Sequence, residues 1–276
     1  MPLFINTNVA SLNAQRNLNK STGELGKTFA RLASGLRINS AKDDAAGMAI
    51  STRMTSQIRG LSQASRNAND GISLIQVADG ALEETTNALQ RIRELAVQAA
   101  NGTYNSTDRA DLQKEVDQLL FEVDRISTDV EFNNKKLLLG TSIRSVDFQI
   151  GDKENQTIEI TITSCDTRAL LGLTSANVTI ITASDAGMAL TQLTKALDSV
   201  TTIRATLGAA QNRFEAVINN LSNVVENISA ARSRIVDADI AAETATLTRN
   251  AILQQAGTAV LAQANQQPQL ALQLLG

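Results

Sequence analysis

The sequence predicts a mostly α-helical protein: a long-helix antiparallel bundle or coiled coil with a small β-hairpin insert, whose discontinuous domains combine the N- and C-terminal halves. Three observations support this fold class. Apolar residues recur at helical spacing over most of the chain, and one short region alternates with a period of two. The two prolines, Pro2 and Pro268, lie near the ends, so no proline interrupts a helix between them.

Both ends of the chain are predicted to form amphipathic helices, because their apolar residues recur three or four positions apart. Neither helix has an obvious globular body beside it in the sequence. We therefore expect the two ends to pair with each other and to leave apolar surface for neighbouring copies. Burial of both helices inside one bundle is the alternative. The residues expected in this terminal packing are Ile5, Val9, Leu12, Leu25, Phe29, Leu32, Leu36, Leu253, Val260, Leu261, Leu270, Leu274 and Leu275.

Three internal segments show the spacing of long packed helices. The first runs over residues 58–89 and the second over residues 112–130, in steps of three and four. The third runs over residues 190–235 and would form a helix about 70 Å long. The residues able to cap these helices are Ser106, Thr107 and Asp108 before the second, and Ser184 and Asp185 before the third.

The region with a period of two lies between the second and third helical segments. Residues 146–150 place apolar side chains at alternate positions, and residues 158–162 do the same. The stretch GDKENQ between them is typical of a turn, so this region predicts a β-hairpin. We also expect a further short strand through Val178 and Ile180.

The composition excludes several kinds of site. The chain has no histidine and a single cysteine, Cys165, so it offers no usable zinc ligand set, no histidine-dependent catalytic triad and no internal disulfide. A net charge of −3 without a basic run argues against a nucleic-acid partner. No apolar run is long enough for a membrane span, and the first residues lack the features of a secretory signal peptide. We expect a protein that is not an enzyme, with no cofactor or metal.

Two parts of the chain resemble bacterial flagellins. The resemblance to the N-terminal half of that family is carried by RLASGLRINSAKDDAAGMAI at residues 31–50 and by QIRGLSQASRNANDGISLIQVADGALEE from Gln57. The resemblance to the C-terminal half is carried by LGAAQNRFEAVINNL from Leu207, by ARSRIVDADIAAETATLTRNAILQQAGTAVLAQAN from Ala231 and by the final LQLLG. It covers about residues 1–140 and 187–276.

The resemblance implies a structural subunit that polymerises with copies of itself into the helical filament used for swimming. It implies an extracellular location, reached through the flagellar export apparatus without a cleaved signal peptide, and contacts with an export chaperone and with cap and hook-junction proteins. The implied domains are an inner core of residues 1–44 paired with 236–276, an outer tube of residues 45–140 with 186–235, and a small β-hairpin region at residues 141–185 with no large outer domain.

The resemblance also implies two sites. Asp43, Asp44 and Gly47 match the segment that connects the inner core to the outer tube and switches subunit packing. These residue types suit a helix break or cap, and a solvated acidic turn is the plain alternative. The stretch LQRIRELAVQAANGTY, residues 89–104, resembles the segment bound by Toll-like receptor 5 of animal hosts, although the same face could serve contacts between subunits. The residues implied in the receptor contact are Arg91 at the centre, with Arg93, Glu94, Leu95, Gln98 and Glu115.

Other functions stay open at this point. A hook-filament junction protein would share the terminal helices, but we would expect its SGLRINSAKDDAAG block to diverge. A cytoplasmic coiled-coil adaptor would form soluble dimers and no filament. An enzyme is disfavoured, because the zinc protease inserted in some flagellins needs histidine ligands.

Overall fold

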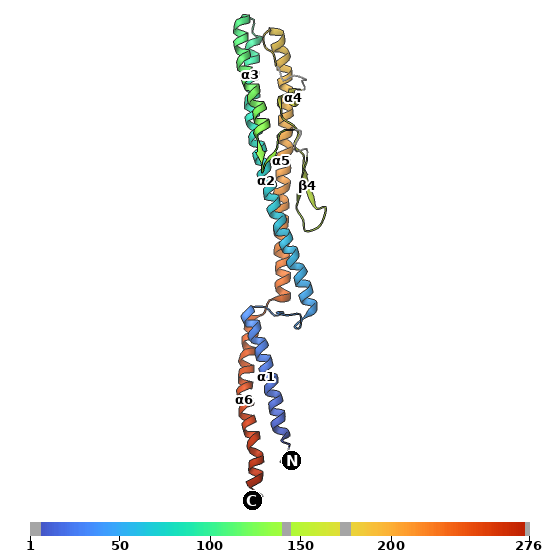
Figure 1. The fold of residues 1–276 in the computed structure, drawn as a ribbon, viewed down its shortest axis with the longest axis vertical. Coiled ribbons are helices and arrows are strands. Elements are labelled where there is room, and N and C mark those ends of the chain that lie inside the picture. The colour runs from blue at the N-terminus through green and yellow to red at the C-terminus, as the bar shows by residue number, and fades with distance from the viewer. Residues whose placement is uncertain (1–6, 140–144, 172–177, 274–276) are drawn as a thin grey trace. The chain divides into compact units, whose positions relative to one another are not determined.

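The computed structural model describes residues 7–139, 145–171 and 178–273 (Figure 1). Most of these residues are helical, and the long helices that the apolar spacing predicts are present, so the predicted fold class is confirmed. The helices in the described ranges are α1 (Val9–Ser34), α2 (Ala45–Ala100), α3 (Ser106–Asp129), α4 (Thr167–Leu171), α5 (Ala183–Val236) and α6 (Ile240–Gln273).

The chain divides into two compact units, and one of them combines the two ends of the sequence. The terminal unit comprises residues 1–58 and 226–276, and the central unit comprises residues 59–225. The boundary between them therefore falls within α2 and within α5, rather than at the ends of these helices. The domain limits expected from the sequence remain a prediction.

The core of the central unit is a heptad stripe along α2. Leu61, Ala68, Ile75, Leu82 and Leu89 repeat every seven residues and are buried. The predicted steps of three and four over residues 58–89 also include the positions between these residues. Those positions are Ser65, Ile72, Asp79 and Thr86, and they are only half-buried. Small residues three positions after each buried apolar residue are buried instead, because a small side chain lets the facing helix approach closely. These small residues are Ala64, Gly71, Ala78 and Thr85.

Helices α5 and α3 complete this core (Figure 1). α5 contributes buried residues that also repeat every seven positions, among them Val200, Leu207 and Phe214. α3 buries Val116 and Val123 in the same cluster. The central unit is thus a packed bundle of long helices, and its hydrophobic contacts run along helix faces.

The predicted hairpin is present in the central unit. β3 (Val146–Gln149) pairs antiparallel with β4 (Thr157–Ile160). Two contacts attach it to the long helices: the Asn67 side-chain amide donates to the carbonyl of Gln149 at 2.9 Å, and the ring of Phe148 meets Phe214 edge-on with 5.6 Å between centroids. The hairpin therefore covers the core rather than standing free.

A second, smaller hairpin was missed by the sequence analysis, which ended its second helical segment at residue 130 and predicted no strand after it. β1 (Glu131–Phe132) pairs with β2 (Lys135–Lys136), and Asn133 and Asn134 connect them with φ angles of 49° and 61°. Positive φ at both central residues is the pattern of a type I′ turn, which asparagine tolerates. The Asn-Asn pair was the available signal.

The strand expected through Val178 and Ile180 is wrong. Residues 178–180 are described but are not part of a strand. Instead, the buried side-chain amide of Gln113 in α3 accepts a hydrogen bond from the Ile180 N–H at 2.7 Å and donates to the Val178 carbonyl at 2.8 Å. One amide side chain therefore satisfies the buried backbone groups that a neighbouring strand would otherwise pair.

Two helix starts differ from the predicted caps. The N-cap of α3 is Asn105, whose side-chain oxygen accepts from the Asp108 N–H at 2.8 Å, while the Asp108 carboxylate accepts from the Asn105 N–H at 3.2 Å. This reciprocal pair is a capping box. At the start of α5, the hydroxyl of Thr182 accepts from the Asp185 N–H at 3.1 Å. The predicted caps lie inside the first turn of each helix.

Candidate functional site

The two end helices lie side by side and antiparallel in the terminal unit (Figure 1). Near the start of α1, Asn8 Nδ2 donates to the carbonyl of Ala264 and Ser11 Oγ donates to Asn265 Oδ1, each at 2.7 Å. Near the end of α1, Arg31 forms an ion pair with Glu243, with 3.7 Å between nitrogen and oxygen. Contacts at both ends of α1 therefore hold it against α6.

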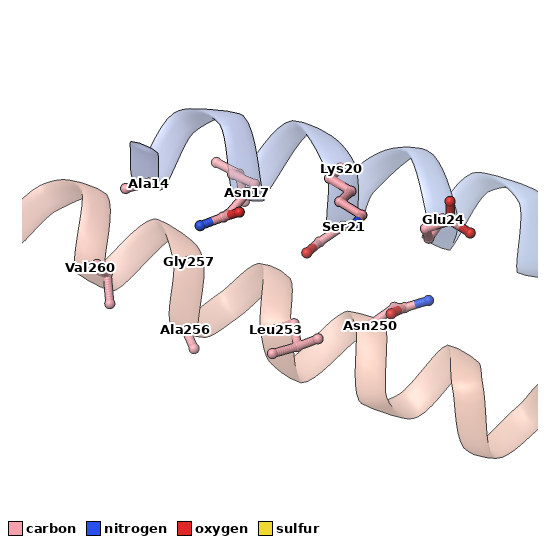
Figure 2. A pocket seen from close by; sticks show the side chains of 11 residues that line it. Ala14, Asn17, Lys20, Ser21, Glu24, Asn250, Leu253, Ala256, Gly257 and Val260 are labelled. Carbon is pink, nitrogen blue, oxygen red and sulfur yellow. The ribbon is translucent and has the colours of Figure 1, made fainter. Parts of the chain in front are cut away.

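A groove of about 480 Å³ runs between α1 and α6 (Figure 2). Its wall combines the apolar residues Leu18, Leu253 and Val260 with polar residues from both helices. The two helices are in contact at Gly257, where an added Cβ would lie 3.3 Å from Leu18 Cδ1. The pair is in contact but incompletely packed. The polar residues lining the groove are Asn17, Lys20, Ser21, Glu24 and Asn250.

Large apolar side chains on both helices point to solvent. Phe29 is 67% exposed and Val260 is 58% exposed. Several exposed large apolar side chains on one helix pair are a candidate interaction surface. Of the residues expected in terminal packing, the exposed ones are Val9, Leu12, Phe29, Leu253 and Val260, and the half-buried ones are Leu25, Leu32, Leu36 and Leu261.

The remaining residues of that expected set cannot be placed. Ile5, Leu274 and Leu275 lie outside the described residues, and so does the side chain of Leu270. Their part in terminal packing stays a prediction.

Of the three implied connecting residues, Asp43 and Asp44 lie in the segment between α1 and α2, and Gly47 lies in the first turn of α2. Asp43 Oδ2 accepts hydrogen bonds from the Ser40 N–H at 3.0 Å and from the Ser40 hydroxyl at 2.9 Å. These bonds favour the carboxylate and lower the pKa of Asp43. Asp44 Oδ1 accepts from the Gly47 N–H at 2.9 Å and so caps the first turn of α2. A side chain at position 47 would collide with this carboxylate.

This connecting segment pairs with the link between α5 and α6. Gly35 ends α1 with a φ of 69°, a left-handed conformation that favours glycine. Its carbonyl accepts from the Ala238 N–H at 2.9 Å, and the Arg37 N–H donates to the Val236 carbonyl at 2.6 Å. Backbone hydrogen bonds thus join two links that lie about two hundred residues apart in the sequence.

The implied receptor residues gather around Arg91, on the part of α2 that α3 covers. Arg91 Nε donates to Glu115 Oε1 and Arg91 Nη1 donates to Glu94 Oε2, each at 3.0 Å. The hydrogen bonds with Glu94 and then Glu115 raise the pKa of Arg91. Because all three side chains are largely exposed, the ion pairs contribute little to stability. Their effect is to fix the direction of the guanidinium.

Leu95 does not belong to this surface. Its side chain is 1% exposed and lies in the core, because α3 packs over this side of α2. The expected direct contact of Leu95 with a receptor is therefore not available in the folded unit. Arg93 and Gln98 are exposed, and Gln98 Nε2 donates to the Tyr104 hydroxyl at 2.9 Å. The sequence analysis did not single out Tyr104, since the hydroxyl's partner depends on the turn that follows α2.

Within the described ranges, no three His, Cys, Asp or Glu side chains are grouped as a metal site would need. None of the described helices has the length and apolarity required to cross a membrane.

These features define a class of long-helix protein in which paired end helices expose apolar side chains. Residues 5–142 match the bacterial flagellin N-terminal helical region, and residues 190–275 match the C-terminal helical region. The chain is 48% identical over 274 residues to the flagellin of Halalkalibacterium halodurans, covering 99% of this chain and 100% of that protein. It is 46% identical over 301 residues to the flagellin of Bacillus subtilis, covering 98% and 99%. The chain belongs to the bacterial flagellin family.

Solved structures agree with this assignment. The crystal structure of Bacillus cereus flagellin is 32% identical, with a TM-score of 0.52, and the match covers 60% of this chain and 94% of that one. A protein from Vibrio parahaemolyticus described as flagellar hook-associated has a TM-score of 0.60 at 11% identity, covering 71% and 100%. At that identity the second match shows a shared fold alone. As a flagellin, the chain is a structural subunit of a filament and belongs to a family of structural proteins, not of enzymes.

Proposed function

We propose that this chain assembles through α1 and α6 into the flagellar filament used for swimming. The observation that carries the proposal is the apolar surface of the paired end helices, including Phe29 and Val260. Burying these side chains against neighbouring copies removes apolar area from water and lowers the free energy. A contact between different patches of identical subunits extends without closing and produces a helical polymer.

The proposed inner core and outer tube each combine segments from both halves of the chain. Residues 1–44 and 236–276 form the inner core, residues 45–140 and 186–235 form the outer tube, and residues 141–185 add a small surface region. Asp43, Asp44 and Gly47 form the segment where packing between subunits switches. The capped turn at these residues supports this role, because its geometry is set by a few hydrogen bonds whose rearrangement redirects α2.

Substitution of Phe29 by serine tests the assembly surface. Burial of a phenylalanine side chain contributes about 1.5–3 kcal/mol, so Phe29→Ser should raise the monomer concentration needed for assembly about 10- to 150-fold. Seeded polymerisation followed by light scattering measures this concentration. Stability of the unpolymerised protein should change little, because Phe29 is 67% exposed there.

Lys27→Ser is the matched control for this experiment. Lys27 lies on α1 two residues from Phe29 and is exposed, with an ion pair to Glu24. The Lys27→Ser substitution removes a long exposed side chain but no large apolar one. The monomer concentration needed for assembly should therefore stay within about twofold of that of the original protein. Equal assembly of Phe29→Ser and the original protein contradicts the proposed surface.

We further propose that the chain is exported through the flagellar export apparatus without a cleaved signal peptide, and that it meets the export chaperone and the cap and hook-junction proteins on its way to an extracellular filament. Membership of the flagellin family supports this route. The intact mass of subunits sheared from cells tests it: a mass lacking the first residues contradicts export without cleavage.

We also propose that the free subunit is recognised by Toll-like receptor 5 through the surface around Arg91. Arg93, Glu94, Gln98 and Glu115 contribute to this surface, whereas Leu95 supports it from the core. The held direction of the Arg91 guanidinium supports the proposal, because a pre-oriented arginine loses little entropy on binding. Arg91→Ala should weaken receptor activation about 30-fold, the effect of losing about 2 kcal/mol of binding.

Arg125→Ala supplies a control with the same loss of charge. Arg125 on α3 is likewise exposed and held by two carboxylates, Glu122 and Asp129. A reporter cell line expressing the receptor should respond to Arg125→Ala as it does to the original protein. An unchanged response to Arg91→Ala, or an equal loss with both variants, argues against recognition at this surface.

A further inference from the structure

We propose that the turn between α2 and α3 contains a site of spontaneous deamidation, at Asn101. In this reaction the backbone nitrogen of Gly102 closes a ring onto the side-chain amide of Asn101. The product is an aspartate or isoaspartate at position 101. No enzyme or cofactor is needed, and the co-reactant is water.

The residue pair has the required chemistry. Asn101-Gly102 is the single Asn-Gly pair in the sequence. Glycine carries no side chain that would shield its nitrogen, and its backbone rotates freely into the geometry of ring closure. Two related pairs, Asp70-Gly71 and Asp79-Gly80, can form the same ring from a carboxyl group, but both lie inside α2.

The structure separates these three pairs by their surroundings. Asn101 and Gly102 are exposed and lie outside the helices, and the Gly102 N–H has no hydrogen-bond acceptor among the described residues. The Asp-Gly pairs are held in helical geometry by the backbone hydrogen bonds of α2, which restrain both the dihedral angles and the nitrogen. The fold therefore protects two pairs and leaves one reactive.

Local hydrogen bonds also prepare Asn101 for the reaction. Its side-chain oxygen accepts from the Thr103 N–H at 3.3 Å, which turns the side-chain amide back over Gly102. Arg109 Nη2 donates to the main-chain carbonyl of Asn101 at 3.1 Å. This carbonyl belongs to the peptide group that contains the Gly102 nitrogen, so the cationic donor stabilises the anion formed when that nitrogen loses its proton.

The chemical step balances without any oxidant or reductant. A solvent base removes the Gly102 N–H proton, and the nitrogen attacks Cγ of Asn101, forming a C–N bond and expelling the side-chain nitrogen as ammonia. Water then adds to either carbonyl of the succinimide ring and opens it. Cleavage of the bond from nitrogen to Cγ yields aspartate, and cleavage of the bond from nitrogen to the main-chain carbonyl carbon yields isoaspartate.

The product changes the turn in two ways. Either outcome adds a carboxylate within reach of Arg109 and makes the net charge one unit more negative. Isoaspartate also adds one carbon to the main chain between α2 and α3. That turn positions Tyr104, which accepts a hydrogen bond from Gln98 in the surface around Arg91.

Ageing of the purified full-length protein in mildly alkaline buffer at body temperature tests the proposal. We expect a species about 1 Da heavier, with the change mapped to residue 101 and isoaspartate detected there by an isoaspartyl methyltransferase. Residues 70 and 79 serve as internal controls and should stay unmodified until the protein is unfolded in urea.

Gly102→Ala is the matched variant, because an added Cβ meets no atom within 4 Å and the backbone φ lies outside the glycine-favouring region. This variant should fold normally and form the modification at least about tenfold more slowly than the original protein does. Two results overturn the proposal: an intact Asn101 under conditions that convert a peptide of residues 98–104, or equal conversion of Asn101 in Gly102→Ala.

Discussion

A buried glycine in α2 provides a quantitative test of the central packing. An added Cβ at Gly71 would lie 2.9 Å from Cζ of Phe214 and 3.2 Å from its Cε atoms. The Phe214 ring is fully buried and meets Phe148 edge-on, so it has no room to move aside. We therefore predict that Gly71→Ala is destabilising, although alanine normally favours a helix.

The magnitude follows from two opposing contributions. Replacing a glycine inside a helix with alanine stabilises by about 1 kcal/mol, whereas forcing a methyl group into a packed core costs about 1–3 kcal/mol. Gly80 lies in the same helix, and an added Cβ there meets nothing within 4 Å, so Gly80→Ala should show the gain alone. Gly71→Ala should therefore be about 1–3 kcal/mol less stable than Gly80→Ala.

Thermal and urea unfolding of the unpolymerised protein, followed by circular dichroism, measure this difference. At about 2–4 °C per kcal/mol for a unit of this size, Tm should differ by about 2–12 °C between the two variants. Combining Gly71→Ala with Phe214→Leu removes the clash, so the penalty of the alanine should fall by about 1 kcal/mol or more. Equal stability of Gly71→Ala and Gly80→Ala, or no coupling with Phe214→Leu, refutes the packing described here.

Three further predictions follow from buried or hydrogen-bonded groups. Gln113→Leu should destabilise by about 2–4 kcal/mol in urea unfolding, because it leaves two buried backbone groups unpaired; a loss below about 0.5 kcal/mol contradicts this. Burial raises the pKa of the Cys165 thiol to about 12 from 9.0. The buried, protonated thiol therefore stabilises the fold below pH 9, and this stabilisation is lost as the pH rises toward 12. A thiol reagent at neutral pH should label Cys165 only after unfolding. Hydrogen bonds from Ser40 lower the pKa of Asp43 below its ordinary 3.8. The ionised carboxylate therefore stabilises this turn above pH 3.8, and the stabilisation is lost as the pH falls through the lowered pKa. An NMR titration of the Asp43 carboxyl should show a midpoint below 3.8.

The helices and the main hairpin could be predicted from the sequence because their signals are local. Residues three, four or seven positions apart share a helix face, so the spacing through Leu82 and Leu207 already indicates long packed helices. Residues two positions apart share a face of a strand, so the alternation over residues 146–150 and 158–162 indicates a hairpin. The family was also recognisable from short sequence blocks such as the one that contains Asp43 and Gly47.

Local spacing could not decide which of two adjacent stripes on a helix is buried. Ile72 and Thr86 have apolar or small side chains at seam positions, yet the more deeply buried residues are Gly71 and Thr85. The choice depends on how closely α5 approaches α2, and that distance is set by residues more than a hundred positions away. The burial of Leu95 likewise depends on α3.

What the sequence alone determined about this protein is therefore the long helices, the main hairpin, the absence of histidine chemistry and membership of the flagellin family. Only the tertiary structure decided that Gln113 pairs with the backbone near Ile180, that Arg91 is held by Glu115 from another helix, and that α1 and α6 leave Phe29 exposed. The physical reason is that these outcomes are contacts between distant segments, whose free energy exists only once the chain has folded.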